Sequence, residues 1–284
     1  MKKIYGLIGH PVKHSLSASM HNAAFKALAL DAQYQLFDKT TKELAGFIAE
    51  VQKPESQVFG LNVTIPHKVA VHDLLKGSLA ENAQKIGAVN TIIVKEENNK
   101  RKLTGDNTDG KGFLESLDKD LHFDFRDKII FVLGAGGAAR AVIMSLGNGP
   151  EKIYFTDIDE ERARDLESDF KKYFDKNKIH QVKEYGRRDC IKICDLFVNA
   201  TALGMKESDP DVLEPEVLHK NMYIFDCVYN PKETKLTRLA KENKLDYTNG
   251  LGMLLYQGAA SFRLWTNIEP PIEVMRSALN EALG

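Results

Sequence analysis

The feature that most constrains the fold is a glycine-rich stretch, VLGAGGAARAV at residues 132–142, which continues the apolar run KIIFVLG. Gly134, Gly136 and Ala139 match the pattern G-x-G-x-x-G/A. The first glycine permits a tight turn, the second lets the backbone approach a pyrophosphate, and the small third residue lets helix and strand pack closely. The helix that follows offers unpaired N–H groups to phosphates. A strand before the loop and a helix after it predict a dinucleotide-binding unit.

Acidic residues after the next strand add a second feature of a dinucleotide-binding unit. Asp157, in FTDID at residues 155–159, lies 21 residues after Gly136. An acid at that distance is typical of contact with the adenosine ribose hydroxyls of NAD, whereas a 2′-phosphate would meet like charge. We expect Asp159 to be the N-cap of the helix that follows. The nearest basic residue beyond them is Arg162. The sequence therefore predicts NAD as cofactor, with NADP left open.

Strand-like and helix-like segments alternate along the chain, which predicts an α/β fold with a doubly wound parallel sheet in its second half. The expected helices include 17–30, with Ser17 as N-cap, 41–51, and two in the tail at 252–267 and 271–284. Two strands around a polar turn are expected within 88–107. The other expected strands span 3–10, 32–38, 58–66, 128–134, 152–157, 195–201 and 223–229.

Composition excludes several classes of protein. Lys+Arg total 39 and Asp+Glu 40, a net charge of −1, so the chain lacks the basic face of a nucleic-acid-binding protein. We expect no membrane association, because no apolar run approaches the roughly 20 residues of a transmembrane helix. Three cysteines fit free thiols in a reducing compartment, and no clustered ligands predict a metal site. Since residues 1–4 lead directly into strand-like sequence, we expect no signal peptide and a cytoplasmic location.

Polar residues gather in short motifs outside the glycine loop. NVTIPHK (62–68) places Asn62 and Thr64 on one face of a strand, and Lys68 just beyond the proline that ends it. KHSLS (13–17), GAVNT (87–91) and GDNTDG (105–110) are further polar motifs. With GHPVKHSLSASMHNAAF, GAGGAAR, NATALGM, VYNP and NGLGMLLYQGA, in this order over nearly the whole chain, they resemble the shikimate/quinate dehydrogenase family.

The resemblance implies two domains: an α/β substrate domain with a mainly parallel sheet (residues 1–109 plus 250–284) and a Rossmann-like cofactor domain (110–249). The active site of the family lies in the cleft between them. The implied catalytic residues are Lys68 and Asp109. The implied substrate-binding residues are Ser15, Ser17, Asn62, Thr64, Lys68, Asn90, Asp109, Tyr229 and Gln257. The implied cofactor-binding residues are Gly134, Ala135, Gly136, Gly137, Ala138, Asp157, Ile158, Arg162, Thr201, Ala202, Cys227, Val228 and Gly250.

The chemistry expected of the family fits these residue types. Hydride transfer at a secondary alcohol also requires a proton to move at the alcohol oxygen, and a lysine whose pKa is tuned by a partly buried site can move it. We therefore predict that Lys68 transfers the proton and that Asp109 orients it and holds the reacting hydroxyl. The serine hydroxyls of Ser15 and Ser17 suit a substrate carboxylate as neutral donors.

The chain departs from the commoner family pattern at one place. Many shikimate dehydrogenases carry NRT after the second strand of the cofactor domain, and its arginine clamps the 2′-phosphate of NADP. Ile158 occupies that arginine position in this chain, between two aspartates. This resembles the quinate/shikimate dehydrogenases that use NAD. The substrate, shikimate or quinate or both, stays open, as does the oligomeric state, because family members are monomers or homodimers.

Two other readings compete with this one. Another two-domain nicotinamide enzyme, of the methylene-tetrahydrofolate dehydrogenase type, is disfavoured by the motifs SLSASMHN and GDNTDG. A non-catalytic dinucleotide or quinate sensor on the same fold would be expected to lack the lysine–aspartate pair, and Lys68 and Asp109 are both present.

Overall fold

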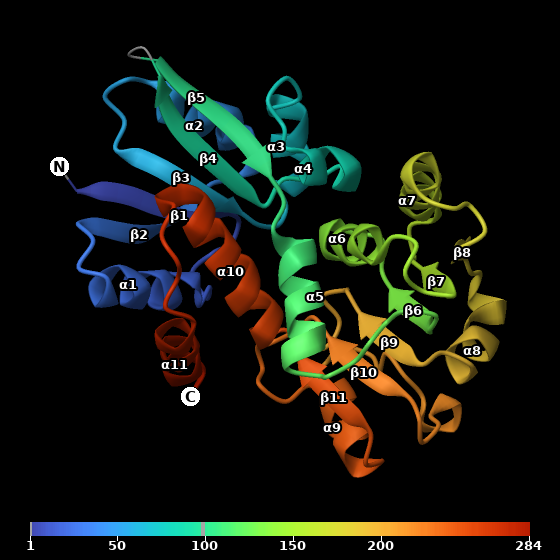
Figure 1. The fold of residues 1–284 in the computed structure, drawn as a ribbon. Coiled ribbons are helices and arrows are strands. Elements are labelled where there is room, and N and C mark those ends of the chain that lie inside the picture. The colour runs from blue at the N-terminus through green and yellow to red at the C-terminus, as the bar shows by residue number, and fades with distance from the viewer. Residues whose placement is uncertain (1, 98–99) are drawn as a thin grey trace. The chain divides into compact units, whose positions relative to one another are not determined.

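The computed structural model describes residues 2–97 and 100–284, which form two compact units. Unit 1 runs to Thr108 and resumes from Leu254 to Gly284, and unit 2 comprises Asp109–Met253. Each unit contains its own β-sheet (Figure 1). The α/β fold class is confirmed.

Unit 1 has a mixed sheet with the strand order β2-β1-β3-β4-β5 in its described residues. Its strands are β1 (Lys3–Gly9), β2 (Ala32–Asp38), β3 (Val58–Val63), β4 (Thr91–Glu97) and β5 (Lys100–Asp106). β1 pairs in parallel with β2 and β3, whereas β4 is antiparallel to both of its neighbours. The predicted hairpin of β4 and β5 is present. The centre of its polar turn, residues 98–99, lies outside the described residues.

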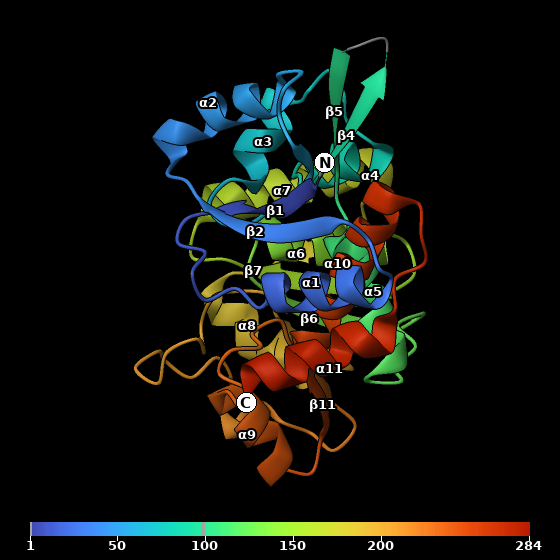
Figure 2. The same cartoon turned by 90° about the vertical axis from the view of Figure 1, so that its left-hand side faces the viewer.

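Helices cover both faces of this sheet. They are α1 (Ser17–Ala27), α2 (Thr41–Gln52), α3 (Lys68–Leu74), α4 (Glu81–Ile86), α10 (Leu251–Thr266) and α11 (Ile272–Leu283). One core joins Ile8 of β1 to Leu44 of α2 and Val71 of α3. On the opposite face, the ring of Tyr5 lies 5.2 Å from that of Phe25 and 5.3 Å from that of Trp265. Figure 2 shows α2 and α3 on one side of β1 and β2, and α1 and α11 on the other.

Two local expectations differ from the structure in unit 1. Ser17 is the first residue of α1 and not its N-cap, which is Leu16. The reason is that the Ser15 hydroxyl accepts the Ser17 backbone N–H at 3.3 Å, so the serine two residues earlier makes the contact expected of a cap. The strand expected at 58–66 ends at Val63, because the chain turns there and the His67 N–H donates to the Thr64 carbonyl.

Unit 2 has an all-parallel sheet with the strand order β11-β10-β9-β6-β7-β8 in its described residues. Its strands are β6 (Ile129–Leu133), β7 (Lys152–Thr156), β8 (Ile179–Gln181), β9 (Leu196–Asn199), β10 (Tyr223–Asp226) and β11 (Asp246–Asn249). The chain builds outward from β6 first on one side and then, from β9, on the other. This confirms the doubly wound sheet and places its topological switch point between β6 and β9.

Among the helices of unit 2, α5 leads into β6 and the others lie between consecutive strands of its parallel sheet. They are α5 (Asp109–Lys119), α6 (Gly137–Leu146), α7 (Glu160–Tyr173), α8 (Glu184–Lys192) and α9 (Lys235–Glu242), with a short 3₁₀ helix at Pro215–Val217. No helix among the described residues is both long enough and apolar enough to cross a membrane.

Candidate active site

A buried network of polar side chains occupies the middle of unit 1. It joins Asn62 at the end of β3 to Asn90, and Asn90 to Gln257 of α10, although Asn90 and Gln257 are 167 residues apart. Asn62 Nδ2 donates to the Asn90 carbonyl at 3.3 Å, and Asn90 Nδ2 donates to Gln257 Oε1 at 3.3 Å. The structure therefore brings together three of the residues predicted to meet substrate hydroxyls.

Asn90 is the centre of this network. Its Oδ1 accepts from the Thr91 hydroxyl at 2.8 Å and from the Thr108 N–H at 2.7 Å, while its Nδ2 donates to the Thr108 hydroxyl at 3.0 Å. Ser261 of α10 closes the network, with its hydroxyl 2.8 Å from that of Thr91. Asn90 is 1% exposed, so these bonds satisfy polar atoms that water does not reach.

Asn62 is held by protein partners at both ends of its carboxamide. The Tyr34 hydroxyl donates to Asn62 Oδ1 at 2.8 Å, and Asn62 Nδ2 donates to the Ser261 hydroxyl at 2.9 Å. Tyr34 in turn stacks on the fully buried ring of His21, with the centroids 4.4 Å apart. Burial lowers the pKa of His21 to about 3. Beyond Tyr34, the network therefore borders a buried aromatic layer in which His21 is neutral.

Lys68 is the first residue of α3 and is half-buried. Its carbonyl accepts the N–H of Val89, at 2.9 Å, and Val89 immediately precedes Asn90 in the GAVNT motif. The lysine backbone is therefore tied directly to the segment that carries the centre of the polar network. Thr64, also half-buried, donates its N–H to the Ile8 carbonyl at the end of β1.

The two serines of KHSLS lie together at the start of α1. The Ser15 hydroxyl donates to that of Ser17 at 3.2 Å. Ser17 is 4% exposed and Ser15 is half-buried. This geometry gives a compact pair of neutral hydroxyl groups.

Asp109 begins α5 and is 5% exposed. It directly follows Thr108, the member of the polar network that contacts Asn90. Asp109 is also the first residue of unit 2. The glycine after it is required by close packing, because a Cβ on Gly110 would lie 2.8 Å from the Ser145 Cβ.

In unit 2, the glycine loop has the geometry that the sequence predicts. Gly134 has φ +113°, a backbone conformation that strongly favours glycine, and a Cβ there would lie 3.1 Å from the Ala200 carbonyl. Gly136 is the N-cap of α6, and a Cβ there would meet no atom within 4 Å in the described structure. Ala139 is fully buried, which explains the small third residue of the pattern.

The loop therefore presents backbone and open space where a phosphate would approach. Ala135 is fully buried, whereas Gly136, Gly137 and Ala138 are half-buried at the start of α6. The side chain of Thr201, which follows β9, lies beside Gly134 across the topological switch point. Residues of this type and arrangement fit a dinucleotide.

Asp157 is bound to the glycine loop itself. Its Oδ2 accepts the Ala135 N–H at 2.6 Å and its Oδ1 accepts the Asp159 N–H at 2.9 Å. Asp159 is the N-cap of α7 and accepts the Arg162 N–H, as predicted. The Arg162 guanidinium lies 3.2 Å from Asp159 Oδ2 and 3.9 Å from Asp157 Oδ1. Ile158 is fully exposed.

The remaining predicted cofactor residues follow the carboxyl ends of β9, β10 and β11. Thr201 is half-buried and Ala202 exposed, and the Thr201 hydroxyl donates to Asn199 Oδ1 at 2.7 Å. Gly250 lies against Cys227, since a Cβ on Gly250 would be 2.0 Å from the Cys227 carbonyl. Its N–H donates to the Val228 carbonyl at 3.2 Å. Together with the glycine loop, these segments therefore lie at the carboxyl ends of the strands in the unit 2 sheet.

Two titratable groups with raised pKa values lie at or just after the carboxyl end of β10. Burial raises the pKa of Asp226, which ends β10 and accepts hydrogen bonds from Thr234, Val228 and Asn199. Burial also raises the pKa of the half-buried Tyr229. Among the described residues, no group of histidine, cysteine, aspartate and glutamate side chains is arranged to hold a metal ion.

Sequence reasoning missed several members of the polar network. Thr91 and Thr108 stand in the motifs GAVNT and GDNTDG but were given no role. Tyr34 and Ser261 have no signal in the sequence, because they occupy ordinary positions of a strand and a helix. Only the fold shows that their hydroxyls meet Asn62.

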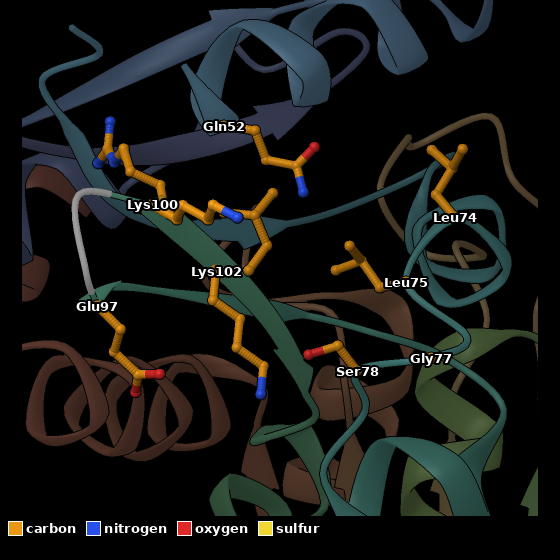
Figure 3. Close-up of a pocket in the computed structure, with 10 residues that line it drawn as sticks. Gln52, Leu74, Leu75, Gly77, Ser78, Glu97, Lys100 and Lys102 are labelled. Atoms are coloured by element: carbon orange, nitrogen blue, oxygen red, sulfur yellow. The ribbon is translucent and has the colours of Figure 1, made fainter. Parts of the chain in front are cut away.

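A pocket of about 610 Å³ lies elsewhere in unit 1 (Figure 3). Lys100 and Lys102 of β5 line one side, and Leu74 and Leu75 at the end of α3 line another. None of the residues predicted to bind substrate or cofactor lines it. It is therefore separate from the candidate active site.

Comparisons with known proteins agree with this geometry. Two family models match the chain: the shikimate dehydrogenase substrate binding domain over residues 7–92, and the shikimate 5′-dehydrogenase C-terminal domain over residues 250–279. A shikimate dehydrogenase (NADP(+)) from Methanopyrus kandleri is 40% identical, and the match covers 99% of this chain and 96% of that protein.

Solved structures are similar over the same length. The crystal structure of a shikimate dehydrogenase in complex with NADP+ is 38% identical, with a TM-score of 0.88 over 100% of this chain and 96% of that one. The quinate dehydrogenase from Corynebacterium glutamicum in complex with NAD is 29% identical, with a TM-score of 0.89 over 99% of both chains.

Proposed function

The chain belongs to the shikimate dehydrogenase family, and from that premise we propose that it interconverts 3-dehydroshikimate and shikimate with a nicotinamide cofactor. As a member of this family it is an oxidoreductase that acts on a CH–OH group with NAD or NADP. The observation that carries the proposal is the polar network of unit 1. It gathers Asn62, Asn90 and Gln257 from three distant parts of the chain, as a polyhydroxylated ring would require.

In this proposal, some side chains bind the substrate and others transfer the proton. Ser15 and Ser17 donate hydrogen bonds to the substrate carboxylate, and Thr64, Asn90 and Gln257 meet the ring hydroxyls together with Asn62. Tyr229 lies near the ring. Lys68 delivers a proton to the carbonyl oxygen as the ketone is reduced and takes it back in the reverse direction. Asp109 orients the lysine and holds the reacting hydroxyl.

The cofactor, when bound, supplies the hydride. The loop at Gly134–Gly136 accommodates its pyrophosphate, because the open space at Gly136 lies at the N-terminus of α6, where the N–H groups of a helix point outward. Thr201, Cys227 and Gly250 line the nicotinamide end.

We further propose that NAD is preferred to NADP. Asp157 and Asp159 share the single positive charge of Arg162, so these three side chains carry a net charge of −1. The residue between the aspartates, Ile158, is exposed and apolar. A 2′-phosphate placed there would meet this net negative charge, and the nearby cation, Arg162, is already paired with both aspartates. Ribose hydroxyls would instead find a carboxylate acceptor. The NADP enzymes at about 40% identity make this a proposal that needs a direct test.

The test is an assay of shikimate oxidation with NAD and with NADP at matched concentrations, repeated with quinate. We expect turnover of shikimate, with kcat/KM for NAD at least about tenfold above that for NADP, a difference of about 1.4 kcal/mol. An advantage for NADP would contradict the cofactor proposal alone. No turnover in any combination would contradict the proposed activity and favour a non-catalytic sensor.

A second candidate activity is the oxidation of quinate, alone or beside that of shikimate. The observation that favours it is the absence of an arginine at position 158, combined with the similarity to a quinate dehydrogenase in complex with NAD. The same assay distinguishes the two, because kcat/KM for quinate above that for shikimate would favour the quinate dehydrogenase.

A substitution at position 158 tests the proposed cofactor preference directly. Ile158→Arg places a guanidinium beside the ribose site, and we expect the ratio of kcat/KM for NADP to that for NAD to rise by about tenfold or more. Ile158→Gln is the matched control, since it adds a long polar side chain without charge. An equal effect of both variants would show that charge at this position does not select the cofactor.

A further inference from the structure

The residue before Lys68 is a fully buried histidine with one strong contact. His67 is the N-cap of α3, yet its side chain makes no capping hydrogen bond. Instead, its Nε2 lies 2.6 Å from the carbonyl oxygen of Lys39, in the connection between β2 and α2. A carbonyl oxygen can only accept, so Nε2 carries a proton and donates it.

This contact anchors the start of α3 to the rest of unit 1. Lys39 is itself held, because its N–H donates to the carbonyl of Gly9 at the end of β1. The His67 N–H donates to the Thr64 carbonyl at 2.9 Å, and the Lys68 carbonyl accepts from Val89. The first residues of α3 are therefore fixed to the connections that follow β1, β2 and β3 and to the one that precedes β4.

The other ring nitrogen shows that this position does not simply require a bulky group. His67 Nδ1 is buried and has no hydrogen-bond partner within residues 2–97 and 100–284. An apolar side chain would fill the same space without leaving a polar atom unsatisfied. The Nε2 contact to Lys39 is what a histidine adds here.

We propose that His67 is a positioning residue for Lys68. The lysine reaches its reacting atom through a flexible four-carbon stem, so the protein can set the origin of that stem only through the backbone of Lys68. The bond from His67 to Lys39 holds this backbone in place, and a small displacement of a reacting group costs much of the rate. The inference rests on the proposed function, in which Lys68 transfers the proton.

The test compares replacements that keep or lose the contact. In His67→Gln the side-chain amide nitrogen takes the place of Nε2 and still reaches the Lys39 carbonyl. In His67→Asn the amide is too short to do so, and His67→Leu removes the donor in case the asparagine variant does not fold. His72→Asn, little more than one turn later on α3, is the matched control because the Nδ1 of that histidine lies 3.3 Å from Oδ1 of its neighbour Asp73, in the same helix.

The expected result is a loss of kcat without a loss of substrate binding. We expect kcat of His67→Asn and His67→Leu to fall about 10- to 100-fold, with KM for substrate and cofactor nearly unchanged. His67→Gln should restore most of kcat, and His72→Asn should leave it unchanged. Melting temperatures of all variants, measured in parallel, show how much of any loss reflects unfolding.

Two outcomes would overturn the inference by itself. Either kcat is unchanged in His67→Asn and His67→Leu, or His67→Gln loses as much kcat as they do, in which case the bond to Lys39 is not the reason. Failure of the proposed function has a different signature. The unmutated chain would then turn over no substrate, or Lys68→Ala would keep full activity, and the inference would fall with it.

Discussion

Unit 1 and unit 2 prepare their candidate binding surfaces in different ways. In unit 1 the groups are side chains, such as Asn62 and Asn90, which hold one another through buried hydrogen bonds. In unit 2 they are mainly backbone groups of the loop at Gly134–Gly136, whose position depends on φ values and close packing. A side-chain network specifies the arrangement of hydroxyls on a substrate, whereas a backbone loop recognises the phosphates that many cofactors share.

The largest expected effect tests the reactive group at the edge of the unit 1 network. Lys68→Ala should lower kcat by about 10²- to 10⁴-fold, because it removes the proposed proton-transfer group. Substrate binding should be largely kept, since most of the proposed hydroxyl and carboxylate contacts come from other residues. Steady-state kinetics and substrate titration measure the two separately. Unchanged turnover would exclude Lys68 from the mechanism and leave unit 1 as a binding surface only.

The second prediction tests whether unit 2 depends on its backbone. Gly134→Ala forces an alanine to φ +113° beside the Ala200 carbonyl, and we expect it to cost about 1–3 kcal/mol of stability. Gly136→Ala places its methyl group in open space at an ordinary φ of −72°, so stability should change by less than about 0.5 kcal/mol. Chemical denaturation of both variants measures this.

Cofactor titration of the same pair sharpens the contrast. The methyl group of Gly136→Ala occupies the space that a pyrophosphate would approach, so the cofactor should bind at least about tenfold more weakly in a fully folded protein. Unchanged affinity of Gly136→Ala would mean that the phosphates do not approach the loop at this residue.

The difference between the units also explains what the sequence could predict. The cofactor loop is local: its strand, glycines and acid lie within about 30 residues, so spacing alone predicts it, including Asp159 as N-cap. Spacing alone does not predict that Asp157 accepts the Ala135 N–H. That contact depends on how closely the pairing of β6 with β7 brings together the loops that follow these two strands.

The unit 1 network is non-local, and local patterns could not predict it. Tyr34 and Ser261 follow strand and helix periodicity like any core residue, and only long-range packing places their hydroxyls on Asn62. The three-residue strand β8 is likewise too short to show a period. The expected roles of Lys68 and Asp109 came from the family resemblance, since a single lysine and aspartate are not distinctive.

The third prediction concerns the aromatic layer under the network. His21 has a folded-state pKa of about 3 because of burial, below the ordinary 6.5, so protonation favours the unfolded chain. Its contribution is fully present above pH 6.5 and is lost as the pH falls from 6.5 toward 3. At pH 5 the loss is about 2 kcal/mol. Urea unfolding at pH 7.5 and pH 5 measures it.

Replacement of this histidine separates its effect from that of other titrating groups. His21→Phe keeps an aromatic ring against Tyr34 and cannot be protonated, so the stability difference between the two pH values should shrink by about 2 kcal/mol. His180→Gln, which changes a half-buried histidine of unit 2, is the control and should leave that difference in place. An unaltered difference in His21→Phe would mean that the buried ring is not the source of acid sensitivity.

The smallest expected effect tests whether hydrogen bonds within the network, and not the mere presence of Asn62, prepare unit 1. Tyr34→Phe removes only the hydroxyl that donates to Asn62 Oδ1, leaves a buried acceptor unsatisfied, and should cost about 1 kcal/mol of stability. With one end of its carboxamide released, Asn62 is less well ordered, so KM for substrate should rise while KM for cofactor stays constant. Tyr173→Phe, at an exposed position of α7 in unit 2, should change neither. If Tyr34→Phe alters cofactor KM as strongly as substrate KM, the two surfaces are not prepared independently, and the distinction between a side-chain site in unit 1 and a backbone site in unit 2 fails.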